Sequence, residues 1–249
     1  MAFASYPSLE NKVVFITGGA SGIGASLVEA FHGQGARVAF IDLRADAGRA
    51  LSARLGGVWF ARCDASDADA LAAAVRDAAE ALGPITVLIN NVADDTRHEA
   101  ADLSAEAWRR GLAVNLDPAF VAATAVYPMM RAAGGGSIVN ISSINALLGP
   151  ADLAGYAAAK GAINALSKSL AHAWGADNIR VNALSPGWVV TERQLELWLT
   201  PEAEAAWMAL VALKARIQPR DVASLALFLA ADDSAMITGQ NLVIDGGRT

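Results

Sequence analysis

The sequence predicts an α/β protein in which a parallel β-sheet is covered by helices on both faces. Short runs rich in β-branched and aromatic residues, typical of buried strands, occupy residues 12–17, 35–42 and 58–62. A longer segment with helical spacing follows each run. Strands that alternate with helices pair in parallel, and the helices cover both faces of the sheet. In such sheets ligands bind beyond the carboxyl ends of the strands.

Length and composition fit one domain with a large core. The chain has 249 residues, of which 54% are hydrophobic, and this excludes a disordered protein. No internal repeat, linker or low-complexity tract interrupts the pattern. We therefore expect a single domain over residues 1–249.

Charge and cysteine content exclude several classes of function. The formal charge is −6 and the basic residues are scattered, which argues against a nucleic-acid partner. The single cysteine, Cys63, excludes an internal disulfide and a thiol cluster for zinc, so packing is its expected role and no metal site is predicted. No signal-peptide pattern is present, and no apolar run reaches the ~18 residues of a membrane span. We expect a soluble, cytoplasmic protein without a membrane partner.

A glycine-rich turn follows the first strand directly and opens a helix that runs to about Gln34. Glycines stand at Gly18, Gly22 and Gly24. A strand that enters a glycine turn at the start of a helix is the context of a dinucleotide-binding loop. The glycines let the backbone approach a pyrophosphate, and the helix N-terminus offers free N–H groups. The alternative is a tight strand–helix turn without a ligand.

Two acidic residues follow the next strands. Asp42 lies at the end of the second strand, where an acid accepts hydrogen bonds from an adenosine ribose. Its charge would repel a 2′-phosphate, so NAD is predicted over NADP, although Arg44 weakens that preference. Asp42 is alternatively the cap of a helix over residues 45–55. Asp64 either meets the adenine amino group or begins a turn, and the sequence leaves both open.

The fourth strand, residues 86–91, ends in the amides Asn90 and Asn91, and residues 92–100 form the most polar loop on that rim. In the two helical segments that follow, at 104–115 and 117–133, one position is unusual. Asn115 stands where a helix former is expected. It is either a polar insert toward the site or an ordinary kink.

Residues 143–160 carry the groups best suited to catalysis. They follow an apolar run at 137–142 that predicts a strand, and they lead into an Ala-rich helix. Tyr156 and Lys160 are four residues apart, so on a helix they share one face. A cation beside a phenol lowers the pKa of the tyrosine from about 10 and favours a proton acceptor, while Ser143 offers a hydroxyl to the reacting oxygen. The alternative is a helix whose polar face carries both residues without function.

The C-terminal third continues the alternation. A strand at 179–184 is closed by a Pro-Gly turn, and Thr191 follows on the same rim. Residues 192–213, rich in Trp and Leu and interrupted by Pro201, predict two helices of a flap at about 190–215 over a substrate. Core packing is the alternative. The remaining predicted elements are a helix at 221–231 and a strand at 240–244.

These motifs together resemble the short-chain dehydrogenase/reductase family along essentially the whole chain. The family's glycine pattern, Thr-Gly-x-x-x-Gly-x-Gly, is present at 17–24, and its Pro-Gly turn with a following threonine at 186–191. The resemblance implies a three-layer, doubly wound Rossmann-type fold. The family's tetrad of Asn, Ser, Tyr and Lys is matched, with thirteen residues from serine to tyrosine, by Asn115, Ser143, Tyr156 and Lys160.

Within the family, the chain is most similar to bacterial NAD-dependent aldose 1-dehydrogenases of the D-xylose, L-fucose and L-arabinose type. It departs from the family at 90–93, where Asn-Asn-Ala-Gly is replaced by Asn-Asn-Val-Ala and a Cβ is added near the nicotinamide side. The resemblance does not select the sugar. The stretches that carry it are 6–9, 94–98, 191–194 and 213–217.

The resemblance implies hydride transfer from C1 of a pentose or 6-deoxyhexose to NAD⁺, which gives the sugar lactone. Tyr156 would be the general base, Lys160 would lower the pKa of that tyrosine and bind the ribose, and Asn115 would fix a relay water. The expected cofactor-binding residues are Gly18, Ser21, Gly22, Ile23, Gly24, Asp42, Asp64, Asn90, Tyr156, Lys160, Pro186, Gly187, Val189 and Thr191. The expected substrate-binding residues, for the loop members of which a solvated position is the alternative, are Asp94, Arg97, His98, Ser143, Asn145, Tyr156, Trp188 and Gln194.

Two other functions stay open. An NAD(P)H-dependent ketone or 3-oxoacyl reductase of the family would use the same tetrad, although Asp42 and the polar rim weigh against it. A non-catalytic NAD(H)-binding regulator on this fold is expected to have a broken tetrad, whereas this one is intact. Residues 153–174 are apolar nearly all round, so we expect a homo-oligomer; the family favours a tetramer, but the pattern does not separate it from a dimer.

Overall fold

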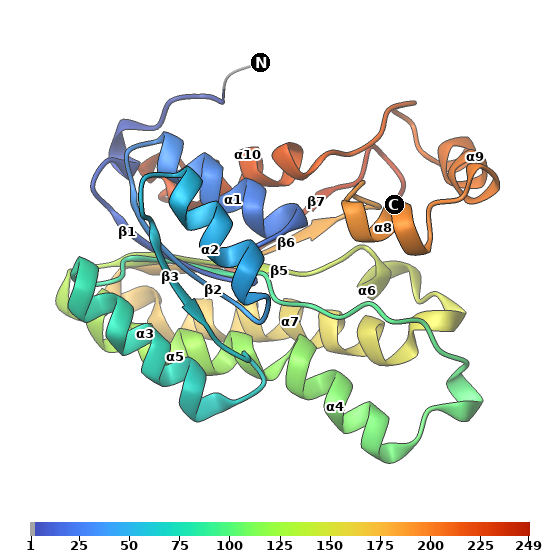
Figure 1. Cartoon of the computed structure of the whole chain (residues 1–249), viewed down its shortest axis with the longest axis horizontal. Helices are drawn as coiled ribbons and strands as arrows, with labels where there is room; N and C mark the ends of the chain where they lie inside the picture. Colours follow the sequence, from blue (N-terminus) through green and yellow to red (C-terminus); the bar gives the residue numbers. More distant parts are fainter. Residues whose placement is uncertain (1–2) are drawn as a thin grey trace.

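All seven strands of the central sheet run parallel, in the order β3-β2-β1-β4-β5-β6-β7. The computed structural model describes residues 3–249 (Figure 1). This arrangement confirms the predicted fold class. The strands are β1 (Val13–Thr17), β2 (Arg37–Asp42), β3 (Trp59–Arg62), β4 (Val87–Asn90), β5 (Gly136–Ile141), β6 (Ile179–Pro186) and β7 (Asn241–Ile244).

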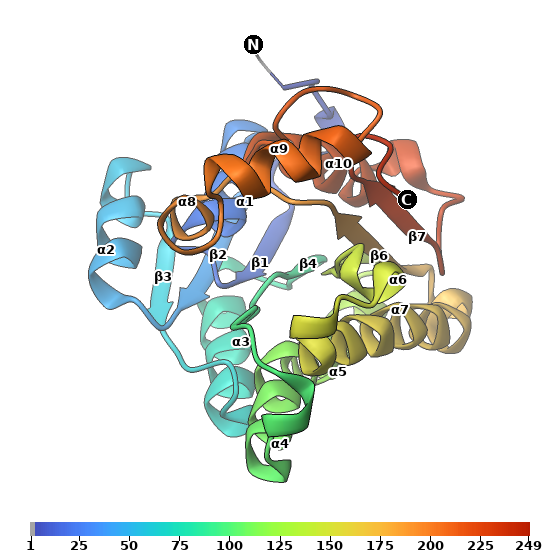
Figure 2. The ribbon, with the colours of Figure 1, turned by 90° about the vertical axis from the view of Figure 1, so that its right-hand side faces the viewer.

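Helices cover the sheet on both sides, as Figure 1 shows. One layer holds α1 (Gly22–Gly33), α2 (Ala45–Arg54) and α10 (Pro219–Ala230). The opposite layer holds α3 (Ala68–Leu82), α4 (Ala105–Asn115), α5 (Asp117–Ala132) and α7 (Ala154–Trp174). Three short helices lie near the carboxyl edge of the sheet (Figure 2), namely α6 (Asn145–Leu148), α8 (Glu192–Leu197) and α9 (Pro201–Leu210).

The central strands β1, β4, β5 and β6 are buried because both faces of the sheet carry apolar side chains there. On the α1 and α10 side, Ile16 and Phe40 pack with Leu27 and Leu227. On the other side, Phe15 packs with residues of α3 and α5. A strand that is covered on both faces needs a continuous apolar run, and this explains why the runs were visible in the sequence.

The strand order reverses beside β1. The chain builds β1, β2 and β3 outward in one direction, and then crosses back to place β4 on the free side of β1. The carboxyl ends of β1 and β4 therefore diverge into connections on opposite faces, which leaves a crevice between them. This topology places the glycine turn after β1 next to the polar loop after β4.

The predicted breaks between helices are present. The backbone leaves helical geometry at Leu116 (φ −127°, ψ −56°), between α4 and α5. Pro201 begins α9, where a missing N–H costs no helical hydrogen bond. Helix α10 begins two residues earlier than predicted, at Pro219, because Gln218 and Asp221 form a capping box. The short helix α6 was not predicted.

Residues 105–132 are long and apolar enough to span a membrane by length and composition, contrary to our expectation from the sequence. They are the one such stretch within residues 3–249. In the structure the stretch is broken at Leu116 into two helices. Helix α5 packs against α3 and the sheet through Ala122, Val126 and Met130, so the apolar face belongs to the core.

Candidate active site

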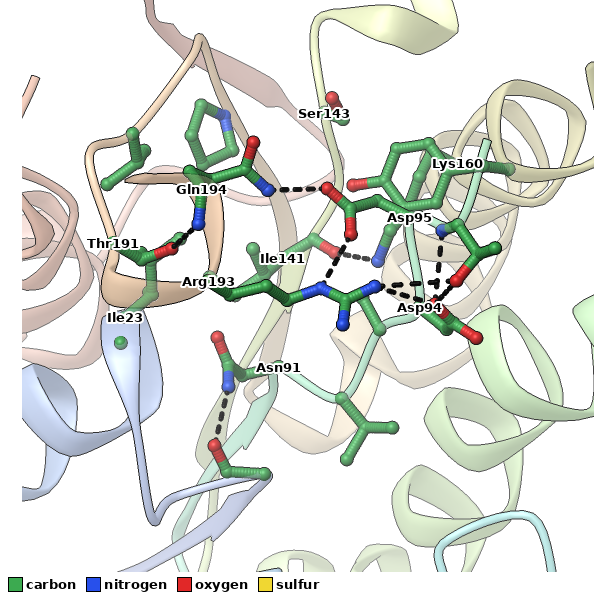
Figure 3. A pocket seen from close by; sticks show the side chains of 18 of the residues that line it. Ile23, Asn91, Asp94, Asp95, Ile141, Ser143, Lys160, Thr191, Arg193 and Gln194 are labelled. Carbon is green, nitrogen blue, oxygen red and sulfur yellow. Dashed lines mark hydrogen bonds and ion pairs between the residues drawn. The ribbon is translucent and has the colours of Figure 1, made fainter. Parts of the chain in front are cut away.

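A cleft of about 1040 Å³ lies beyond the carboxyl ends of the strands. It is lined by the glycine turn after β1, by residues that follow β2, β3, β4 and β5, and by helices α7, α8 and α9. Figure 3 shows part of its lining, with Asp94 and Asp95 facing Arg193 and Gln194. The cleft occupies the position predicted from the strand order.

The glycine turn can be built only from glycine at two positions. Gly18 has φ +68°, which side chains other than glycine rarely adopt. A Cβ on Gly24 would lie 1.9 Å from the carbonyl oxygen of Gly18. The turn opens α1 and lines the cleft together with Ser21 and Ile23. Free N–H groups at the start of a twelve-residue helix, next to an open cleft, fit the pyrophosphate of a dinucleotide.

Asp42 lines the cleft at the end of β2. Its carboxylate accepts hydrogen bonds from the backbone N–H of Ala20 and of Arg44, both at 2.9 Å. Helix α2 has no side-chain cap, so the alternative role of Asp42 as that cap is not observed. The acid is held in place against the glycine turn, which fits the adenosine end of a dinucleotide.

Asp64 forms the turn that was one of its two predicted roles. Its carboxylate accepts hydrogen bonds from the N–H and the hydroxyl of Ser66, at 2.9 and 2.7 Å. These hydrogen bonds lower the pKa of Asp64. The residue also lines the cleft, so the turn does not exclude contact with an adenine.

Asn90 was predicted to bind the cofactor, but it does not line the cleft. Its side chain is buried in the sheet, where the amide donates to Asn140 at 2.8 Å. The next residue, Asn91, lines the cleft instead and donates to the carbonyl oxygen of Gly18 at 3.0 Å. Successive side chains of a strand point to opposite faces, so only one of the two amides can face the cleft.

The replacement of the family's Ala-Gly by Val92 and Ala93 is accommodated without a break in the loop. The backbone N–H groups of Asn91 and Val92 donate to the Thr17 hydroxyl, at 3.0 and 3.3 Å. Val92 packs against Gly18, where a Cβ would come within 3.1 Å of it, and Ala93 is exposed and lines the cleft. The added side chains therefore lie against the glycine turn and at the cleft surface.

Asn115 is buried at the end of α4 and reaches the loop after β4. Its side chain accepts from the N–H of Asp94 at 2.8 Å and donates to the carbonyl oxygens of Asp94 and Gly111, both at 3.0 Å. The helix ends at Asn115, as a kink requires, and the amide contacts the loop after β4 without lining the cleft. All of these polar contacts are with the backbone, so its observed role is to hold the loop at Asp94.

Ser143, Tyr156 and Lys160 line the same wall of the cleft. Burial raises the pKa of the Tyr156 phenol; a hydrogen bond with Ser143 opposes this rise and the charge of Asp95 adds to it. Lys160 is buried, and burial lowers its pKa to about 8. Its ammonium donates to the carbonyl oxygen of Ile141 at 2.7 Å and lies 5.6 Å from the centre of the Tyr156 ring.

The predicted lowering of the Tyr156 pKa by Lys160 is therefore wrong for the protein alone. Lys160 is buried and Tyr156 is partly buried, and desolvation penalises the phenolate as well as the ammonium. Desolvation is the largest cause of both pKa shifts.

The Pro186–Gly187 turn, Val189 and Thr191 line the cleft as predicted. A Cβ on Gly187 would lie 2.9 Å from Cα of Asp245, so this turn also requires glycine. Thr191 caps α8 by accepting from the N–H of Gln194 at 3.3 Å, and its methyl group faces Gly22. The turn and the glycine loop thus form two facing walls.

The predicted substrate residues separate into two groups. Asp94, Arg97, Asn145, Trp188 and Gln194 line the cleft. His98 does not: its ring accepts from the N–H of Gly155 at 3.4 Å, outside the cleft lining. Arg97 lies at the rim, pairs with Asp152 at 3.1 Å and covers the ring of Trp198.

Asp95 lines the cleft and was missed in the sequence. It follows Asp94 in an irregular loop, where no periodicity tells which of two adjacent acids points inward. No group of three or more His, Cys, Asp or Glu side chains within residues 3–249 is placed to hold a metal ion.

Comparisons with known proteins identify the family. The family model described as enoyl-(acyl carrier protein) reductase matches residues 18–249. The probable galactose dehydrogenase of Rhizobium meliloti is 45% identical over 98% of this chain and 97% of its own. The D-xylose 1-dehydrogenase of Caulobacter vibrioides is 43% identical over 99% of both chains. The chain belongs to the short-chain dehydrogenase/reductase family.

As a short-chain dehydrogenase/reductase, the protein is a soluble oxidoreductase that acts on CH–OH groups and uses NAD(P). A solved structure of 7α-hydroxysteroid dehydrogenase, in complex with NADH and 7-oxo glycochenodeoxycholic acid, superposes with a TM-score of 0.92 at 31% identity. The match covers 97% of this chain and 96% of the other.

Proposed function

We propose that the protein is an NAD-dependent sugar dehydrogenase that oxidises C1 of an aldose, a pentose or a 6-deoxyhexose, to the lactone. The observation that carries this proposal is the polar wall of the cleft. Asp95, Gln194 and Trp188 are joined by hydrogen bonds and line the same cleft as Ser143, Tyr156 and Lys160 of the tetrad. Fixed carboxylate, amide and indole groups suit a ligand that carries several hydroxyls. The full-length similarity to galactose and xylose dehydrogenases supports the same substrate class.

The chain's own residues would act on the substrate as follows. Tyr156 would take the hydroxyl proton as general base, and Ser143, already in hydrogen-bond contact with the phenol, would orient the reacting oxygen. Lys160 would stabilise the phenolate together with the positive charge of the bound NAD⁺. Asn115 would hold the substrate loop and leave its backbone fixed during closure. When bound, NAD⁺ would supply the hydride acceptor and a positive ring.

The residues that fit the cofactor come from the glycine turn, from the ends of β2 and β4, and from the facing Pro-Gly turn with Thr191. The glycine turn and the start of α1 would hold the pyrophosphate, Asp42 the adenosine ribose, and Thr191 the carboxamide. Asn91, whose amide faces the cleft, takes the place that we had predicted for Asn90. Asp42 favours NAD over NADP because a 2′-phosphate would meet its carboxylate. Its pairing with Arg44 at 4.0 Å is too exposed to cancel that charge.

A second candidate is a ketone or 3-oxoacyl reductase that uses NAD(P)H. The similarity to a hydroxysteroid dehydrogenase structure and the description of the matching family support it. A steroid or an acyl chain needs an apolar cleft; apolar side chains contribute to this one, but Asp94 and Asp95 stand among them in the lining. A non-catalytic NAD(H)-binding regulator is the weakest candidate, since the whole tetrad is present. We further propose that the protein is cytoplasmic and tetrameric, and that residues 190–215 form a flap over the substrate.

The test is NADH formation with NAD⁺ and, separately, with NADP⁺, across aldoses, polyols, secondary alcohols and hydroxyacyl thioesters. Turnover of one or two aldoses with NAD⁺ is expected. Tyr156→Phe should lower kcat at least about 100-fold, since general base catalysis contributes 10²–10⁴-fold, while NADH binding, followed by fluorescence, stays near that of the unmodified protein. Reduction of ketones with NADPH, together with no oxidation of sugars, would favour the second candidate.

A further inference from the structure

Asp95 is the acid that the fold turns into the cleft. Its side chain is 27% exposed, whereas that of the adjacent Asp94 is 53% exposed. Asp94 is occupied by a local turn, in which it accepts from the N–H and hydroxyl of Thr96 at 3.1 and 2.6 Å. Asp95 makes no such turn. Its contacts are with helix α8, on the other side of the cleft mouth (Figure 3).

The orientation of the Asp95 carboxylate is determined by two donors. One oxygen accepts from Gln194 at 2.6 Å, and the other from Arg193 at 3.1 Å. Gln194 is itself held, because its carbonyl oxygen accepts from the indole N–H of Trp188 at 2.7 Å. This second contact prevents the amide from turning over, so its NH₂ group stays directed at Asp95.

The carboxylate keeps acceptor capacity for a ligand. A carboxylate offers about four lone-pair sites, and Arg193 and Gln194 use one on each oxygen. The remaining sites require donors, and a sugar supplies hydroxyl donors, whereas a hydrocarbon or a steroid ring does not. A charged acceptor left without a donor in a closed cleft is costly.

Asp95 also lies near the reacting groups. It lines the same cleft as Ser143, Tyr156 and Lys160. The charge of Asp95 raises the pKa of Tyr156. Figure 3 shows Asp95 on the same side of the cleft as Ser143 and Lys160, so its carboxylate is placed to accept from a hydroxyl next to the carbon that Tyr156 and Ser143 would engage.

We propose that Asp95, held by Arg193 and Gln194, is the specificity residue that accepts a hydrogen bond from the hydroxyl next to the reacting carbon. This inference rests on the proposed function, because it assigns one contact within the same site. It explains why Gln194 and Trp188 line the cleft without facing the reacting groups directly: they position the acid. It also makes Asp95, and neither Asp94 nor His98, the residue of this loop that selects polyhydroxylated substrates.

The test couples a substitution to the removal of one substrate hydroxyl. Two substrate pairs are used, namely the best aldose with its 2-deoxy form, and cyclohexane-1,2-diol with cyclohexanol. For the unmodified protein we expect kcat/KM to be about 10- to 100-fold higher for the hydroxylated member, the range of a charge-assisted hydrogen bond. Asp95→Ala should lose most of this preference, because its activity falls on the hydroxylated member and changes little on the other.

Glu99→Gln is the matched control. It removes one exposed carboxylate from the same loop, outside the cleft, and should keep the full preference. Asp95→Asn keeps the shape and one acceptor oxygen, so an intermediate preference is expected. The melting temperature and NADH binding show whether Asp95→Ala folds. If it does not, Asp95→Asn tests the role of Asp95 in the preference.

Three outcomes overturn the proposal. Equal losses on both members of a pair indicate a structural role for Asp95. An unchanged preference in Asp95→Ala excludes the contact. Loss of the preference in Asp94→Asn, with Asp95→Asn unaffected, assigns the contact to the neighbour. Absence of turnover with every aldose refutes the proposed function alone, because the cyclohexane pair still reports on Asp95.

Discussion

Burial shifts the pKa values of Tyr156 and Lys160 in opposite directions. The pKa of Tyr156 is raised and the pKa of Lys160 is lowered to about 8, in both cases first through desolvation. Each group is thus held in a less charged state than in water. Residues in such a position are selected for catalysis and not for stability, and replacing them can stabilise a protein.

Lys160→Met should therefore stabilise the protein without cofactor at neutral pH. The fall of the lysine pKa from 10.5 to about 8 corresponds to about 3 kcal/mol at 1.36 kcal/mol per pH unit. Loss of the hydrogen bond to Ile141 destabilises the variant by about 1 kcal/mol and offsets part of this gain. We expect a gain of about 2 kcal/mol in the free energy of unfolding, measured by urea denaturation, with turnover lost.

The pH dependence of stability gives an independent check on Lys160. Between its folded pKa of about 8 and its ordinary pKa of 10.5, Lys160 binds fewer protons in the folded than in the unfolded state, so stability rises with pH. The rise is best followed from about pH 8 to pH 9.5, below the ordinary pKa of tyrosine. Tyr156 is neutral in both states over this range. Lys160→Met should lack the rise, while Lys168→Met, an exposed lysine on the same helix, should keep it. Equal slopes in all three proteins would contradict the buried ammonium.

At the scale of elements, the cleft is closed by a contact between two segments that are weak on their own. Helix α8 has six residues and is too short to be stable without tertiary contacts. The loop after β4 has no regular structure before residue 100. Arg193 joins them by ion pairs to Asp94 and Asp95, at 3.3 and 3.1 Å. Exposed ion pairs of this kind contribute little to stability, so the contact is suited to opening and closing.

Arg193→Ala should change ligand affinity more than stability. The Arg193 side chain is 50% exposed, so we expect the free energy of unfolding to change by less than about 1 kcal/mol. The KM for the best substrate should rise roughly 2- to 10-fold and lose its dependence on salt, since salt screens this pair in the unmodified protein. Arg109→Ala, an exposed arginine on α4, is the control. A KM that stays equal to that of the control would exclude a role in closure.

At the scale of the whole molecule, one face of the helical layer carries apolar side chains in contact with solvent. Phe120 of α5 is 52% exposed, and Trp108 of α4 is 38% exposed. An apolar groove of about 500 Å³ lies beside Phe120, lined also by Leu116, Val121 and Leu166. The exposed positions of α7 close in sequence to Leu166 and Ala162 include the small residues Ala158 and Ala165. Such a surface is typical of an association face.

Phe120→Asp should dissociate the oligomer that we propose. A charge at the centre of an apolar interface is desolvated without a partner, and this destabilises the assembly. Sedimentation velocity should show a smaller particle than for the unmodified protein at equal concentration. Leu210→Asp, an exposed position on α9 beyond the other face of the sheet, should leave the mass unchanged. A monomeric unmodified protein would refute both the tetramer and the role of this face.

Much of the architecture was predictable because buried strands form continuous apolar runs and amphipathic helices repeat with a period of 3.6 residues. The glycine turn, Asp42 and the pair Tyr156 and Lys160 were predictable for the same reason. Each stands directly at the end of a strand or on one helix face, so its direction follows from the element that carries it. Asn115 was found as a break in helical periodicity, and the structure places its amide at the cleft loop.

Only the tertiary structure decided the lining contributed by loops. In the loop after β4 no period relates neighbouring side chains, so Asp95 faces the cleft while Asp94 is taken up by a turn and His98 lies outside. Asn91 lines the cleft in place of the predicted Asn90 for a related reason. The residue at which β4 ends determines which of the two amides faces the cleft. The pKa values of Tyr156 and Lys160 were set by burial against distant segments, and burial is a property of packing in three dimensions that adjacent residues do not encode.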